Sequence, residues 1–246
     1  MQLTELVNYC DARLDAAAFD DFCPNGLQVE AGERVGRIVS GVTASLALVE
    51  AAAAAGADLL LVHHGYFWKG EPAPLRGMKG RRVQRLMQSG ISLLAYHLPL
   101  DAHPELGNNA GLGRALGFAG APIADLSLIW GVDLQQPLPA EDLAATIERA
   151  LGRAPLALHA GRPLRRVAWC TGAAQGYIAE AADAGYDAFI SGEVSEQTLH
   201  LARELDIAYF AAGHHATERF GVMSLGDELA RRFDLEHRFI DIDNPV

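Results

Sequence analysis

A repeated segment is the feature that most constrains how this chain folds. Residues 50–65 read EAAAAAGADLLLVHHG and residues 179–194 read AEAADAGYDAFISGEV, so an alanine-rich run, an AGxD turn and an apolar run recur in the same order. Alanine-rich runs are typical of helices, and short continuous apolar runs are typical of buried strands. AGxD turns are also common in unrelated α/β proteins, but the shared order at a constant offset favours an internal duplication. The repeat therefore predicts two similar α/β lobes.

Short β-type runs alternate with helical runs along the rest of the chain. We expect strands at 37–43, 58–63, 91–96, 125–133, 166–170, 187–190, 207–211 and 236–241, and helices at 45–55, 79–89, 110–117, 140–151, 174–184, 194–204 and 214–233. This alternation predicts an α/β fold with mixed sheets flanked by helices. Together with the repeat, it predicts two interlinked lobes. Residues 1–125 and 215–246 would form the first lobe, and residues 126–214 the second.

Composition narrows the class of protein. The formal net charge of -11 argues against nucleic acid as a main partner, although a metal ion would still allow an anionic small substrate. The three cysteines are widely spaced and form no CxxC, which disfavours a disulfide framework or a cysteine zinc site. We see no signal peptide pattern and no apolar run that would span a membrane, so we expect a cytoplasmic protein.

Polar side chains gather where three predicted strands end. His63 and His64 close the strand at 58–63, and His97 and Asp101 follow the strand at 91–96. The third set, His214 and Glu218, follows the strand at 207–211. Ligand sites in α/β sheets lie beyond the carboxyl ends of strands. Imidazole and carboxylate groups suit zinc, iron, manganese and nickel, so these residues predict a metal site.

The spacing of these residues adds geometric detail. His214 and Glu218 stand at i and i+4, so they face the same way on a helix. Adjacent His63 and His64 would point to opposite faces of a regular strand, so both can serve one site only if the strand ends there, which Gly65 permits. Pro99 disfavours a helix through 97–101, which predicts a loop for that segment. Two neighbouring histidines can also bind two different ions, with Glu218 or Asp101 as the bridge.

Other polar residues fit either a supporting or a chemical role. Glu193, at the repeated strand end, and His97 are candidates for proton transfer, although a structural role for Glu193 is equally compatible with its position. His215 fits an outward or supporting neighbour of His214. The remaining histidines lack a partner at a useful spacing and are interpreted as structural or exposed: His103, His159, His200 and His237.

Two further segments lie near these histidines in the sequence. Residues 20–28, DDFCPNGLQ, indicate a tight turn that could also line the site. Residues 66–70, YFWKG, follow the two adjacent histidines, and their aromatic rings could stack on a base while Lys69 contacts a phosphate. A packed loop with an exposed lysine explains the same residues equally well. The chain contains no GxxxxGK[ST], no GxGxxG after a strand and no GxSxG, which disfavours the common nucleotide-binding folds and a serine nucleophile.

From residue 20 to the C-terminus the sequence resembles the GTP cyclohydrolase 1 type 2 family. The segments that carry the resemblance are DDFCPNGLQVEAG, LLVHHGYFWKGE, YHLPLDAHPELGNNAGL, ISGEVSEQTLHLARE and AAGHHATERFGV. The resemblance implies two similar α/β lobes, a dinuclear metal centre and a ring-shaped homohexamer. It places the metal ligands at His63, His64, Asp101, His214 and Glu218, with His97 lining the site.

The family name implies opening of the guanine ring of GTP with release of formate. Three hypotheses about function stay open. The first is a metal-dependent hydrolase that acts on a nucleotide or a related heterocycle. The second is a two-metal phosphoesterase or amidase. The third is a protein without enzymatic activity that binds or delivers metal or is associated with repair. The sequence does not identify the metal, so two divalent ions per chain are expected without further assignment.

Overall fold

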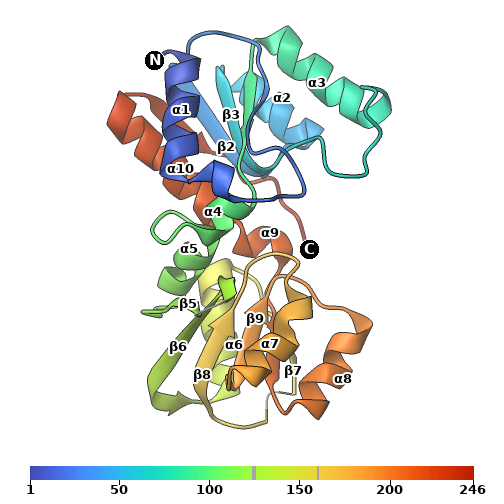
Figure 1. The fold of residues 1–246 in the computed structure, drawn as a ribbon, viewed down its shortest axis with the longest axis vertical. Helices are drawn as coiled ribbons and strands as arrows, with labels where there is room; N and C mark the ends of the chain where they lie inside the picture. Colours follow the sequence, from blue (N-terminus) through green and yellow to red (C-terminus); the bar gives the residue numbers. More distant parts are fainter. Residues whose placement is uncertain (124–125, 160) are drawn as a thin grey trace. The chain divides into compact units, whose positions relative to one another are not determined.

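The computed structural model describes residues 1–123, 126–159 and 161–246. By its internal contacts the chain divides into two compact units. The first unit comprises Met1–Leu100 with Gly221–Asp243, and the second comprises Asp101–Phe220 with Asn244–Val246. Each unit is built around one mixed β-sheet flanked by helices (Figure 1), which confirms the predicted α/β class.

The sheet of the first unit places two predicted strand ends next to each other. Its strands, in the order β1-β4-β3-β2-β11, are β1 (Gly26–Val29), β4 (Ser92–Ala95), β3 (Leu59–His64), β2 (Arg37–Thr43) and β11 (Glu236–Phe239). Strands β11, β2, β3 and β4 are parallel, and β1 is antiparallel to β4. Val62 pairs with Ala95 in the last row between β3 and β4. The chain therefore leaves both strands at the same edge of the sheet.

The helices of the first unit include two that are shared with the second unit by the division of the chain, α4 (Leu98–Ala102) and α10 (Arg219–Phe233). The others are α1 (Leu3–Arg13), the 3-10 turn η1 (Ala16–Ala18), α2 (Leu46–Ala54) and α3 (Gly77–Ser89). Ser45 caps α2 by accepting a hydrogen bond from the backbone of Leu48 at 3.2 Å. Helices α2 and α3 share a core cluster with Leu60 and Val62 of β3. Helix α1, blue in Figure 1, packs against α10, red, where the Tyr9 hydroxyl donates to Glu228 at 2.7 Å.

The second unit has the same layered construction. Its strands, in the order β5-β6-β8-β9-β10-β7, are β5 (Ala121–Ile123), β6 (Leu126–Leu138), β8 (Leu164–Trp169), β9 (Ala188–Ser191), β10 (Ala208–Ala211) and β7 (Leu156–Leu158). The central strands β8, β9 and β10 are parallel. Residue 125, where the sequence predicts that a strand begins and the first lobe ends, lies outside the described residues.

Helices cover both faces of the second sheet. They are α5 (Asn108–Ala115), α6 (Ala140–Leu151), the 3-10 turn η2 (Gln175–Tyr177), α7 (Ile178–Asp183), α8 (Glu196–Glu204) and α9 (His214–Thr217). Helix α6 shares one core cluster with Val167 and Ile190, whereas α7 and α8 share another with Phe189 and Tyr209. The predicted helix at 214–233 is two helices, because the chain breaks at Glu218. In the part of the chain that the structure describes, no helix is both long and apolar enough to cross a membrane.

The internal repeat is visible in the hydrogen bonds of both units. A carboxylate oxygen of Asp58 accepts from the backbone of Arg37 at 2.9 Å, and one of Asp187 accepts from the backbone of Arg166 at 2.9 Å. Each arginine also donates through Nη1 to a carbonyl at the end of the helix preceding the turn, at 2.9 and 2.8 Å. The aspartate of the AGxD turn thus ties the turn to the neighbouring strand in both units, which supports the predicted duplication.

Candidate metal sites

Three histidines form a cluster at the edge of the first sheet. His63 and His64 end β3, and His97 follows β4 directly before α4. One nitrogen of each imidazole lies within 4.8 Å of the others, and the ring centroids are 4.6 Å apart for His63 and His64 and 5.1 Å apart for His63 and His97. His63 is fully buried. Parallel pairing of β3 with β4 is what brings residues so distant in the sequence together.

The end of β3 explains why two adjacent histidines share one site. A side chain at Gly65 would place its Cβ 2.2 Å from Gln28 Oε1 and 2.7 Å from the Cβ of Ala95, so only glycine fits there. Gln28 Oε1 accepts a hydrogen bond from the backbone of Tyr66 at 2.6 Å. The strand therefore stops after His64. As the sequence analysis expected for a strand that ends here, the ring of His64 does not have to point to the opposite face from that of His63.

The imidazole of His63 is oriented by the backbone. Its Nδ1 lies 2.9 Å from the carbonyl oxygen of Tyr96. A carbonyl can only accept, so Nδ1 carries the hydrogen and Nε2 keeps the lone pair that a metal ion requires. His64 Nδ1 lies 3.1 Å from the hydroxyl of Thr43, which can donate or accept. Such contacts at the second nitrogen are the usual support of metal-binding histidines.

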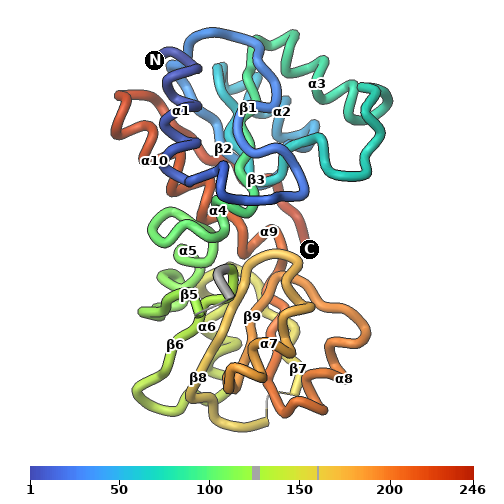
Figure 2. Tube along the Cα trace, in the orientation of Figure 1, coloured from blue at the N-terminus to red at the C-terminus, as the bar shows by residue number. Residues whose placement is uncertain are grey.

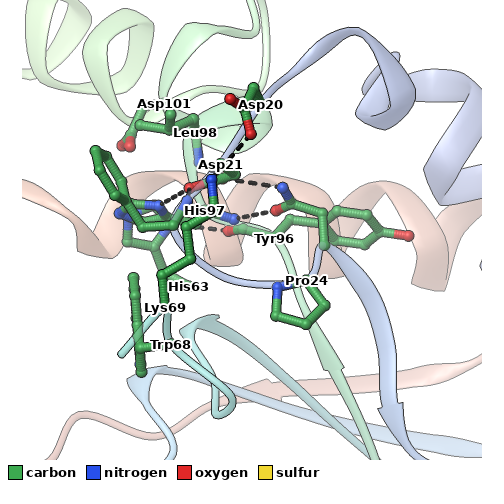
Figure 3. Close-up of polar contacts among 12 residues, drawn as sticks. Asp20, Asp21, Pro24, His63, Trp68, Lys69, Tyr96, His97, Leu98 and Asp101 are labelled. Carbon is green, nitrogen blue, oxygen red and sulfur yellow. Dashed lines mark hydrogen bonds and ion pairs between the residues drawn. The ribbon is translucent and has the colours of Figure 1, made fainter. Parts of the chain in front are cut away.

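A carboxylate orients His97 in the same way. Its Nδ1 lies 2.7 Å from Asp21 Oδ1, and Figure 3 shows this contact. Asp21 also accepts from the side chain of Asn25 at 2.9 Å and from the backbone of Leu98 at 2.9 Å. Burial raises the pKa of Asp21, but the hydrogen bonds from His97 and Asn25 outweigh it and lower the pKa to about 2. Asp21 is therefore a carboxylate at neutral pH.

The segment before β1 thus has a role that the sequence only suggested. Residues 20–28 were predicted to form a turn, and the trace in Figure 2 lets the reader follow this blue segment from α1 to β1. Within it, Asp21 and Asn25 hold the side chain and the backbone of His97, which donates to Asn25 Oδ1 at 2.7 Å. Asp21 Oδ, Cys23 Sγ and a nitrogen of His97 also lie within 4.8 Å of one another. Burial raises the pKa of the Cys23 thiol to about 12, which favours its protonated form.

The prediction of a loop at residues 97–101 is wrong. Residues Leu98–Ala102 form the short helix α4. Pro99 is compatible with it because the first turn of a helix needs no backbone N–H donor from these positions. The correction changes how the segment is held, since the backbone of Leu98 at the start of α4 donates to Asp21.

The second unit holds a histidine between two carboxylates. His214 begins α9, with its Nδ1 2.7 Å from Glu193 Oε1 and its Nε2 3.0 Å from Glu218 Oε2. The last distance confirms that the i,i+4 pair faces the same way. Gly172 lies against this pair, because a Cβ there would be 2.1 Å from Glu218 Oε1. Burial lowers the pKa of His214, but Glu218 and Glu193 raise it to about 9.

Asp101 lies in the same unit as Glu218. A carboxylate oxygen of each lies within 4.8 Å of the other, and both residues are buried. Asp101 Oδ1 accepts from the side chains of Asn108 at 2.8 Å and of Thr171 at 3.3 Å. These neutral donors orient the carboxylate without neutralising it. Buried carboxylates in this arrangement are suitable ligands for a divalent cation.

The remaining histidines contact protein groups of their own. His103 Nδ1 accepts from the backbone of Leu106 at 3.0 Å, and the backbone of His215 donates to the carbonyl of Val246 at 3.0 Å. The other three contact Asp206, Glu196 and Asp227, respectively: His159, His200 and His237. The contacts fit the structural or exposed roles suggested for His103, His159, His200 and His237, whereas His215 is buried and does not point outward.

Each unit therefore contains buried imidazole or carboxylate groups that could hold a metal ion. The first unit brings together His63, His64 and His97, and the second brings together Asp101, His214 and Glu218. The chemistry of both sets fits a divalent transition metal, because the nitrogens and oxygens are oriented by a second layer of hydrogen bonds. Sequence reasoning did not assign the supporting role of Asp21, and it left the role of Glu193 open.

Comparisons with known proteins identify relatives of the whole chain. The profile of the family described as Duf34/NIF3 (NGG1p interacting factor 3) matches residues 1–245. The chain is 57% identical to the GTP cyclohydrolase 1 type 2 homolog of Pseudomonas aeruginosa, with 99% of this chain and 98% of the relative covered. It is 51% identical to the protein of the same name from Escherichia coli K12, over all of both chains.

Solved structures show the same fold. The structure of protein ybgI superposes with a TM-score of 0.96 at 50% identity, and all of both chains is covered. That of TTHA1606 from Thermus thermophilus superposes with a TM-score of 0.92 at 36% identity, again over all of both chains.

Proposed function

The chain belongs to the Duf34/NIF3 family, and on that premise we propose that it is a metal-dependent hydrolase with two divalent ions per chain. The proposed ligands are His63, His64, Asp101, His214 and Glu218. One observation carries the proposal. At His63 and His214 the Nδ1 atom is bound to a carbonyl and to a carboxylate, at 2.9 and 2.7 Å. This arrangement directs Nε2 toward a ligand and is typical of metal-binding histidines.

The second unit gives an independent reason to expect a cation. With its pKa raised to about 9, His214 carries a proton on each nitrogen at neutral pH. Nε2 lies 3.0 Å from Glu218 Oε2, which is within the range of an ion pair. A metal ion binds the same two groups after the Nε2 proton leaves, because imidazole must be neutral to act as a ligand. Positive charge is thus stabilised at this position in either state.

When bound, a divalent metal lowers the pKa of water toward neutrality and stabilises negative charge that develops on the substrate. The chain must then move a proton, and His97 is suited to do so. Asp21 fixes the hydrogen on Nδ1, which leaves Nε2 as the atom that accepts or returns a proton. Glu193 is engaged with Nδ1 of His214, so we propose that it positions this ligand.

Metal analysis tests the central claim. Protein that has never been exposed to a chelator is expected to contain about two divalent ions per chain by elemental analysis. Glu218→Gln is expected to lose at least one of them, whereas the exposed Glu196→Gln, in α8, is a matched control that keeps both. Absence of metal from the wild-type protein would contradict the proposal.

A substrate screen tests the reaction. The name of the relatives makes GTP the first compound to try, with formate release as the readout. Phosphoesters and amides follow, because two-metal sites hydrolyse these too. His97→Ala is expected to lose turnover and to retain both ions. Metal-loaded protein that turns over no substrate would instead favour the alternative of a metal-binding or metal-delivery protein.

A further inference from the structure

Two aromatic side chains flank His97 in the first unit. The ring centroids of Trp68 and His97 are 5.0 Å apart, and the rings are nearly perpendicular, at 82°. The ring of Phe22 has its centroid 6.5 Å from that of His97. Trp68 also lies 5.9 Å from His64, and Figure 3 shows it on the loop that carries Lys69. Both aromatic rings thus lie beside the histidine cluster.

Phe22 is fixed at its backbone and exposed at its ring. The side chain is 60% exposed, which alone says little, because isolated apolar residues are common on protein surfaces. Its neighbours Asp21 and Cys23, however, are both buried, and its carbonyl accepts from the backbone of Lys69 at 2.7 Å. The ring is therefore held on a rigid backbone and left in solvent next to His97. An aromatic ring held in this way is suited to stacking, because little conformational entropy is lost when a ligand binds.

The loop that carries Trp68 adopts a costly conformation. Phe67 has a φ of +66°, a region that bulky residues rarely enter. Such strain is found most often at functional sites. The indole N–H of Trp68 donates to the carbonyl of Gly65 at 3.2 Å, which folds the loop back toward the histidines. The loop is thus held in the conformation that presents Trp68 to His97.

A positive charge lies beside the aromatic rings. Lys69 Nζ lies 3.0 Å from Asp20 Oδ1, and both side chains are exposed (Figure 3). An ion pair of this kind contributes little to stability, so the ammonium group can exchange its partner for an anion on a ligand at small cost. Aromatic rings and a lysine on two hydrogen-bonded loops are suited to bind a heterocycle that carries an anionic group.

We propose that Phe22 and Trp68 form a stacking surface for a planar heteroaromatic ring, and that Lys69 binds an anionic group on the same ligand. The inference rests on the proposed function, because the ligand would be the substrate of that site. It assigns the choice of substrate to these three side chains, which are separate from the proposed metal ligands. Of the two interpretations of residues 66–70, it adopts ligand binding.

Tryptophan fluorescence gives a direct readout of stacking. The chain has three tryptophans, and Trp130 and Trp169 are only 5% and 0% exposed. Quenching by a stacked ring therefore reports on Trp68. The probes are guanosine monophosphate and adenosine monophosphate, whose fused-ring bases do not absorb tryptophan emission, with ribose 5-phosphate as the control that lacks an aromatic ring. We expect both ring-bearing probes to quench and ribose 5-phosphate not to. If neither ring-bearing probe quenches the fluorescence, the proposal is overturned.

Substitutions test each part of the surface separately. Phe22→Leu keeps an apolar side chain and removes the ring, and it is expected to weaken binding of guanosine monophosphate about 5- to 150-fold. Lys69→Gln is expected to weaken binding of guanosine monophosphate and to leave binding of guanosine unchanged. Tyr177→Leu, at a 38% exposed aromatic residue of the second unit, is the matched control and should bind as wild type. Equal affinity of Phe22→Leu and wild type for guanosine monophosphate would refute the role of the ring.

Metal content separates this inference from the proposed function. Phe22→Leu and Lys69→Gln should retain the metal content of the wild type, because neither residue is a proposed ligand. Metal bound with no ring binding would refute the stacking surface alone. Ring binding by a protein that never contains metal would refute the proposed function and leave the stacking surface intact.

Discussion

Replacement of Gly172 by alanine is the sharpest test of the second metal site. Gly172 has a φ of +69°, and a Cβ there would lie 2.1 Å from Glu218 Oε1 and 3.4 Å from His214 Nε2. The nearest atom is the end of a flexible carboxylate, so the least costly response is rotation of Glu218 away from residue 172. Gly172→Ala is therefore expected to remove a ligand without altering any proposed ligand residue.

Two free energies change by different amounts in this variant. The left-handed backbone costs an alanine roughly 1–2 kcal/mol, which lowers the free energy of unfolding by that amount. Displacement of Glu218 adds little to this, because the side chain can move. Altering a group that merely supports a ligand lowers metal affinity about 10- to 100-fold, or about 1.4–2.7 kcal/mol. Loss of the ligand itself is expected to lower metal affinity by no less than this.

Other glycines of the same unit provide matched controls. Gly152 has a φ of +77°, and no atom lies within 4 Å of the position that a Cβ would take there, so Gly152→Ala isolates the backbone cost. Gly176 has neither the positive φ nor a close neighbour, so Gly176→Ala should be close to neutral. Urea unfolding of the metal-free proteins measures stability, and competition with a chelator measures metal affinity. If Gly172→Ala binds metal as tightly as Gly152→Ala does, Glu218 is not a ligand and the reasoning fails.

Three further predictions concern the groups around the histidines. In the metal-free protein the raised pKa of His214 (about 9) stabilises the fold, fully below pH 6.5 and progressively less as the pH rises through 9. Urea unfolding should show this decrease in stability for the metal-free protein and not for the metal-loaded protein. Metal binding at pH 7 should release a proton from His214, and this release should vanish above pH 9. Calorimetry in buffers of different ionisation enthalpy measures the number of protons released. Glu193→Gln should lower metal affinity about 10- to 100-fold with the ligands unchanged, and Asp21→Asn should lower turnover and retain the metal, because Glu193 holds a proposed ligand and Asp21 holds His97. Unaltered metal affinity in Glu193→Gln would show that the contact at Nδ1 of His214 does not matter.

Regular elements of the fold could be predicted because their signals are local. The helix at 45–55 and the strand at 58–63 are seen as Leu46–Ala54 and Leu59–His64, since continuous apolar runs and an alanine-rich stretch need no distant partner to be recognised. The short strands β1, β5 and β7 were not predicted. Each has three or four residues, too few for a period, and each is an edge strand defined by the neighbour it pairs with.

The candidate ligands could be predicted for the same reason, whereas their supporting groups could not. His63 and His64 follow a recognisable strand, so their position at a sheet edge follows from the local pattern. Asp21 lies far from His97 in the sequence, in a segment whose composition indicates only a turn. Its contact with His97 exists because β1 returns antiparallel to β4. Pairing of this kind leaves no mark in the spacing of residues.

Comparison of the two units shows which requirement the duplication retains. His97 and His214 each follow the corresponding strand of their sheets, and in both an acid lies 2.7 Å from Nδ1. The acids come from different places, because Asp21 precedes the repeat and Glu193 stands at the repeated strand end, opposite His64. In the first unit that strand end is taken by His64, so an acceptor for His97 has to come from outside the repeat. In the second unit the strand end supplies the hydrogen-bond acceptor for His214. The next candidate metal ligand is Glu218, at the end of α9. The two units therefore share the orientation of a histidine rather than a set of residues, which is why aligning the repeats identifies the histidines and not the acids that hold them.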